Sequence, residues 1–158
     1  MDKLNNYKKH YPKKEDIDLL IKLFNKRAFE EVAQRVVILQ KQYPNSPELF
    51  QIQGDVSFKL KNYSLALKSY DLAIFHDRKN LMVHYNIGKT KYELGDWKGS
   101  IESYKKALPL ISLKDKIYNN IGTVFNKLGE TENAIKYFRL ASKFNPTSAD
   151  IFYNLGNA

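Results

Sequence analysis

The 158-residue chain contains no cysteine, which excludes disulfide bonds and thiolate-ligated metal sites and agrees with a reducing compartment. No apolar run approaches the length needed to cross a membrane. The start of the chain, MDKLNNYKKHYPKKED, also lacks the apolar core of a signal peptide. We therefore expect a cytoplasmic protein that does not associate with a membrane.

Patterns typical of catalysis and of metal binding are missing as well. The three histidines, His10, His76 and His84, have no carboxylate or cysteine at metal-ligand spacing. There is no glycine-rich phosphate loop, no nucleophile elbow and no pair of carboxylates that would share a cleft. The sequence therefore predicts no catalytic residue, no metal site and no cofactor, and we do not expect an enzyme.

Apolar and basic residues, by contrast, are plentiful. Hydrophobic residues make up 43% of the chain and aromatic residues 13%, which is ample for a folded core. The formal net charge is +9, and the excess lies mainly in residues 1–14 and 81–148. This charge favours acidic partners, although a solvated lysine-rich surface, which needs no ligand, is the favoured interpretation.

A 34-residue period organises most of the sequence, and residues 115–148 show it best. Large and small residues recur there at i, i+3, i+4 and i+7, which predicts one face of a helix: Tyr118, Ile121, Gly122 and Phe125. A second helix follows with Ala134, Phe138 and Ala141 on its inner face. Gly129 suits the left-handed end of the first helix, and Pro146 closes the second.

This order of residues resembles the tetratricopeptide repeat (TPR), in which each repeat is a pair of helices, A and B. The resemblance implies an all-α fold, a right-handed TPR superhelix of antiparallel pairs whose A helices line a concave groove. It covers one TPR domain, residues 13–158, with repeats at 13–46, 47–80, 81–114 and 115–148 and a partial fifth repeat at 149–158. Residues 1–12 form a basic leader that is flexible or caps the first repeat.

Two further packing expectations come from comparing the copies. Gly54, Gly88 and Gly122 occupy one position of helix A, and they would let helix B approach with the core aromatics Tyr70, Tyr104 and Phe138. The first repeat departs from this pattern, with Leu20 at the glycine position and Val32 at an alanine position. Its inner face should consist of Leu19, Leu20 and Leu23 on helix A, and of Val32, Val36 and Leu39 on helix B.

Pro109 falls earlier than the usual end of helix B. Its helix should therefore stop near Leu108, with an irregular apolar linker at residues 110–113.

Polar residues of helix A that packing does not explain are the candidate binding residues. Asn86, Asn120 and Asn154 occupy the same place in successive repeats, and a side-chain amide can pair with the backbone of an extended peptide. The arrangement resembles the asparagine ladder in the TPR superhelix of O-linked N-acetylglucosamine transferases. Equally, these asparagines could brace neighbouring helices. The complete predicted concave face is Asn86, Asn120, Asn154, Phe58, Tyr85, Lys89, Tyr92, Lys116, Thr123, Asn126, Lys127 and Tyr153.

The predicted function is a protein–protein interaction module that binds an extended peptide or partner segment in the groove. On the predicted face, the aromatic residues would supply apolar contact, and the lysines would select acidic ligands. One alternative is that the basic surface binds a polyanion, although nucleic acid is the less favoured partner because the lysines are not confined to one face.

The other alternative comes from the end of the chain. The sequence stops inside helix A of the fifth repeat, so we expect the N-terminal part of a longer protein whose open end self-associates through Phe152 and Leu155. The first repeat loosely resembles the start of bacterial TPR proteins that continue into transferase domains. The repeats would then position substrates for a larger transferase.

Overall fold

The computed structural model describes residues 11–158, and every regular element in that range is helical. The predicted leader lies outside these residues except for Tyr11 and Pro12. The chain divides into two compact units, residues 1–77 and 78–158.

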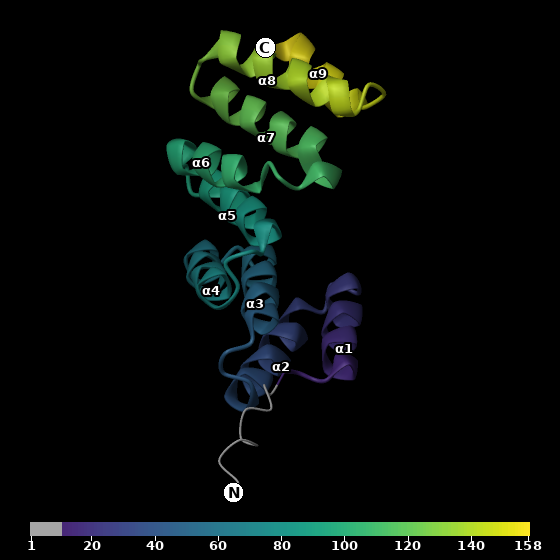
Figure 1. Cartoon of the computed structure of the whole chain (residues 1–158), viewed down its shortest axis with the longest axis vertical. Coiled ribbons are helices and arrows are strands. Elements are labelled where there is room, and N and C mark those ends of the chain that lie inside the picture. Colours follow the sequence, from purple (N-terminus) through teal and green to yellow (C-terminus); the bar gives the residue numbers. More distant parts are fainter. Residues whose placement is uncertain (1–10) are drawn as a thin grey trace, which may run out of the picture. The chain divides into compact units, whose positions relative to one another are not determined.

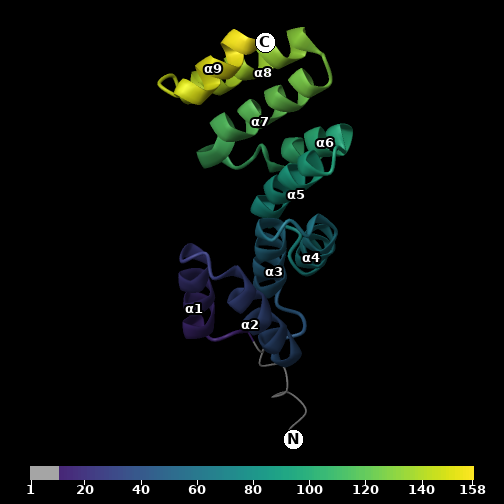
Figure 2. The same cartoon turned by 180° about the vertical axis from the view of Figure 1, so that it is seen from behind.

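Unit 1 contains the first four helices (Figures 1 and 2): α1 (Lys14–Asn25), α2 (Phe29–Gln42), α3 (Pro47–Lys59) and α4 (Tyr63–His76). They form two antiparallel pairs, and α2 packs against α3. The core consists of fully buried aliphatic residues: Leu20, Val32, Val36, Leu49 and Val56.

Unit 2 contains the remaining elements: α5 (Leu81–Glu93), α6 (Trp97–Ala107), the 3-10 helix η1 (Ile111–Leu113), α7 (Lys114–Lys127), α8 (Thr131–Phe144) and α9 (Ala149–Asn157). Helices α5 and α6 form one antiparallel pair and α7 and α8 another, while α6 packs on α7 and α8 on α9. A core between these helices is built on Ile101, Tyr104, Ala107, Ile117, Ile121 and Val124. The prediction of an all-α fold of paired helices is confirmed.

The glycine of helix A fits against an aromatic ring of helix B, as the period predicts. A Cβ atom on Gly88 would lie 2.6 Å from Cδ1 of Tyr104, and one on Gly122 would lie 2.6 Å from Cε1 of Phe138. A Cβ atom on Gly54 would likewise overlap the Tyr70 ring. These rings are buried, so they are core residues and not a binding platform.

Every complete repeat places a left-handed residue at the end of helix A. Arg27, Lys61, Gly95 and Gly129 lie 34 residues apart and have φ angles of 61°, 60°, 76° and 74°. The backbone N–H of Gly129 donates to the Asn126 carbonyl at 3.1 Å, with corresponding bonds in the other three repeats. The predicted turns are therefore in place, but the first two repeats make them without glycine.

The first repeat compensates for its missing glycine. Leu20 stands at the glycine position, yet it is only 1% exposed, because the residue at the aromatic position is the smaller Val36. Helices α1 and α2 nevertheless contact each other less extensively than the helices of the other pairs. Leu19, which the periodicity places inward, is 39% exposed, so that assignment is wrong.

Pro109 ends α6 close to the predicted position, since the last helical residue is Ala107. The segment after it is more regular than expected. Residues Ile111–Leu113 form one 3-10 turn that leads directly into α7 at Lys114.

Candidate binding face of the A helices

The A helices of unit 2 are α5, α7 and α9 (Figure 1), and two side-chain hydrogen bonds link them in sequence. The Nδ2 atom of Asn120 donates to the hydroxyl of Tyr85 at 3.4 Å, and the Nδ2 atom of Asn154 donates to Oδ1 of Asn119 at 3.0 Å. All four side chains are partly buried. We call Tyr85, Asn119, Asn120 and Asn154 the amide face.

The two hydrogen bonds follow one rule, because donor and acceptor are 35 residues apart in both. The asparagine of each later helix A donates to the side chain one position earlier on the preceding helix A. Asn120 and Asn154, two members of the predicted ladder, are thus held by neighbouring helices. The bracing role that the sequence left open accounts for these two bonds.

Besides the groups used in these two bonds, the amide face contains further hydrogen-bond donors and acceptors. An amide carries two N–H donors and an oxygen with two lone pairs. The bond between Asn119 and Asn154 uses the oxygen of Asn119 and a donor of Asn154. The second Nδ2 donor of Asn119 and the Oδ1 acceptors of Asn120 and Asn154 take no part in these two bonds.

Tyr85 of the amide face contacts a second aromatic ring and a lysine. The Tyr85 ring lies 5.8 Å from the ring of Tyr104, centroid to centroid, and the Nζ atom of Lys89 lies 5.8 Å from the Tyr85 centroid. Burial raises the pKa of Tyr85, an effect that Asp115 increases and the Asn120 hydrogen bond partly offsets. Burial also raises the pKa of Tyr104. Both phenols consequently stay protonated at neutral pH.

The other predicted residues are placed in various ways. Tyr92 packs edge-on against Trp97 at 5.2 Å, and Thr123 donates to the Asn119 carbonyl of its own helix at 3.0 Å. Asn86 is partly buried on α5. The most solvent-accessible candidates are Lys116, Asn126, Lys127 and Tyr153, the last of which is 72% exposed.

One predicted residue belongs to unit 1 and not to this surface. Phe58 lies on α3, with its ring 5.6 Å from that of Tyr63. On the same helix Asp55 accepts a 2.7 Å hydrogen bond from the Tyr70 hydroxyl. Burial, followed by the Asp55 charge, raises the pKa of Tyr70.

The predicted concave face omits Asn119, although this residue lies on helix A. Its role as an acceptor depends on the 35-residue relation, whereas the repeat itself suggests only same-position pairs 34 residues apart.

Residues 11–158 contain no group of three or more histidine, aspartate or glutamate side chains arranged to hold a metal ion. None of the helices in this range is both long enough and apolar enough to span a bilayer.

Comparison with known proteins identifies two segments of the chain. Residues 83–110 match a family model described as tetratricopeptide repeat, and residues 122–158 match a model described as TPR repeat. No match is found among curated protein sequences.

Solved structures show the same fold. MamA residues 41 to the end, from Desulfovibrio magneticus RS-1, superpose with a TM-score of 0.82 at 16% identity, over 91% of this chain and 81% of that one. PilF of Pseudomonas aeruginosa gives 0.82 at 18% identity, over 90% and 65%. A chain of the APC/C Cut9–Hcn1 hetero-tetramer gives 0.83 at 14%, over 90% and 29%. At these identities the likeness establishes the fold alone, an α-solenoid of helix pairs.

Proposed function

Because the chain is a tetratricopeptide-repeat protein, a class of scaffold for protein–protein interaction, we propose that it binds an extended segment of a partner on the amide face of unit 2. The partner's backbone would contact the side chains of α5, α7 and α9. No reaction is assigned to these residues.

The observation that carries the proposal is the fixing of the amides by neighbouring helices. Asn120 and Asn154 are each held by a hydrogen bond to the preceding helix A, so ordering them on binding costs little rotamer entropy. An extended peptide presents alternating N–H and C=O groups, and the amide face offers both acceptors and donors. Bracing and binding are therefore compatible roles of one side chain.

The charge of unit 2 supports an acidic partner. Residues 78–158 contain 13 lysines and arginines against 7 aspartates and glutamates. Lys89 lies beside the amide face, and Lys116 and Lys127 are exposed on α7. Such an excess accelerates encounter with an acidic segment and weakens with salt.

The test begins with a phage library of random 12-residue peptides selected on the whole chain. Enriched peptides are labelled with fluorescein, and their affinities are measured by fluorescence anisotropy. Replacing both Asn120 and Asn154 by alanine should weaken binding about tenfold or more, since each hydrogen bond contributes about 1 kcal/mol. Asn133→Ala is the matched control, because that amide pairs within its own helix turn with Glu130 at 2.7 Å.

Tyr85→Phe separates binding from bracing. It removes the acceptor of the Asn120 hydrogen bond but keeps the amide. It should therefore lower the melting temperature, and it should weaken peptide binding less than the double asparagine substitution does. A double asparagine variant that binds selected peptides as tightly as the parent would refute the proposal. If heparin displaced those peptides as effectively as acidic peptides do, the polyanion alternative would be favoured.

A further inference from the structure

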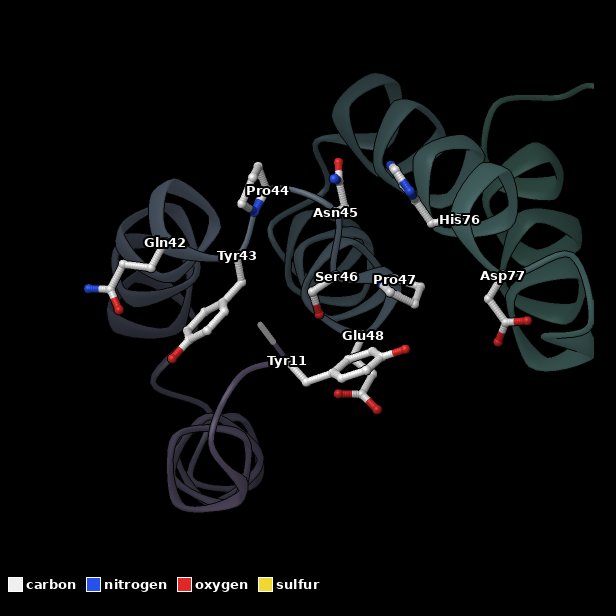
Figure 3. Close-up of a pocket in the computed structure, with 10 residues that line it drawn as sticks. All are labelled: Tyr11, Gln42, Tyr43, Pro44, Asn45, Ser46, Pro47, Glu48, His76 and Asp77. Carbon is white, nitrogen blue, oxygen red and sulfur yellow. The ribbon is translucent and has the colours of Figure 1, made fainter. Parts of the chain in front are cut away.

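Unit 1 contains a pocket that the amide face does not explain (Figure 3). Its volume is about 740 Å³, within the range typical of ligand sites. The lining residues come from the segment before α1, the end of α2, the following loop, the start of α3 and the end of α4: Tyr11, Gln42, Tyr43, Pro44, Asn45, Ser46, Pro47, Glu48, His76 and Asp77. We call it the loop pocket.

The walls of the loop pocket are built before any ligand arrives. Ser46 is 4% exposed, and its hydroxyl accepts a hydrogen bond from the backbone N–H of Leu49 at 3.3 Å. Its own N–H donates to the Tyr43 carbonyl at 3.2 Å, and prolines on both sides restrict the backbone. The His76 ring stacks on Phe50 at 5.5 Å with an angle of 9° between the planes. A preformed pocket pays little ordering entropy on binding.

The charge of the loop pocket is opposite to that of the protein. Among the lining residues that the structure describes, Glu48 and Asp77 carry the fixed charges, and both are negative in a chain whose net charge is +9. Helices α2 and α4 end at its edge with the partial negative charge of a C-terminus, whereas α3 begins there with the partial positive charge of an N-terminus. The sign of the pocket therefore comes from the two carboxylates. Tyr11 and Tyr43 add ring faces, which attract cations.

From this combination we infer that the loop pocket binds a basic side chain, arginine or lysine, of a partner protein. The aliphatic stem would lie along the tyrosine and proline surfaces, and the cation would lie near Glu48 and Asp77. The site is independent of the amide face, because it lies in the other unit and selects ligands of the opposite charge.

The experiment is a titration of the whole 15N-labelled chain with the peptide acetyl-Gly-Arg-Gly-amide, followed by two-dimensional NMR. The comparison peptide carries citrulline, which has the shape of arginine without its charge. Amide signals of residues 45, 46, 48, 76 and 77 should shift with the arginine peptide, and the citrulline peptide should bind about two- to fivefold more weakly, as expected for partly exposed ion pairs.

Variants assign the effect to the pocket. Glu48→Gln and Asp77→Asn should each lower the affinity for the arginine peptide about two- to fivefold. Asp150→Asn should leave the affinity for the arginine peptide unchanged, although Asp150 occupies the position of Glu48 three repeats later and is also exposed. Equal binding of the citrulline peptide, or equal effects of Asp150→Asn and Glu48→Gln, would overturn the inference. Neither result would bear on the amide face.

Discussion

Replacing Gly122 by alanine tests whether the spacing of helices A and B depends on the glycine. The new methyl carbon would lie 2.6 Å from Cε1 and 2.7 Å from Cδ1 of Phe138, whose side chain is 1% exposed. The ring therefore has no open space to enter, and the helices must separate. Overpacking of this kind costs about 1–3 kcal/mol, against a gain of about 0.5–1 kcal/mol in helix propensity. We expect a net loss of about 1 kcal/mol, within a range of about 0–2.5 kcal/mol.

Gly156 provides the matched control, because it occupies the same position one repeat later. A Cβ atom there meets nothing within 4 Å. Gly156→Ala should thus keep only the propensity gain, which we expect to be about 0.5 kcal/mol or less in the last turn of α9. The two identical substitutions are predicted to have opposite signs.

Urea unfolding, followed by circular dichroism and by the fluorescence of the single tryptophan, measures both variants. Trp97 lies on α6, so its emission reports on unit 2. Phe138→Leu in the Gly122→Ala background should cost less than it does alone, since a smaller side chain relieves the overlap. A Gly122→Ala chain as stable as the parent would show that helix spacing is not limited by this contact.

Three other substitutions follow from the same structure. Lys61→Gly should raise the free energy of unfolding by about 0.5–1 kcal/mol, and with it the urea midpoint, because Lys61 has the left-handed φ angle of 60°. Tyr70→Phe should lower stability at pH 7 by removing the hydroxyl that donates to Asp55. Because burial raises the pKa of Tyr70, the parent should also lose stability above the unfolded value of about 10, and Tyr70→Phe should weaken that loss in alkaline melts. Burial, with Lys106, lowers the pKa of His84, so stability should fall below about pH 6.5, but less so in His84→Gln.

The sequence predicts the helix pairs well because their determinants are local or recur at a fixed interval. Gly122 and Phe138 belong to one repeat, so the period alone places them opposite each other, and the structure confirms the contact. The turn at Lys61 forms without glycine at the position that the period assigns to it, 68 residues before Gly129. Leu20 with Val36 shows how a repeat can exchange one large and one small residue and still bury both.

The binding features are harder to predict, because each depends on how separate repeats meet. Asn120 pairs with Tyr85, one position away from its equivalent Asn86, a shift that the 34-residue period does not predict. The loop pocket combines the loop before α3 with the end of α4, residues that no local pattern connects. The 3-10 turn Ile111–Leu113 likewise arises from how the chain passes from α6 to α7.

The two candidate sites make different demands on a partner. The amide face would recognise backbone groups that every peptide has, so specificity there has to come from charge, and the excess of lysine and arginine in residues 78–158 favours acidic segments. The loop pocket would recognise one basic side chain and would reject acidic ones through Glu48 and Asp77. Because salt screens both attractions, rising ionic strength should weaken both classes of ligand, while exchanging an acidic peptide for a basic one should move binding from unit 2 to unit 1.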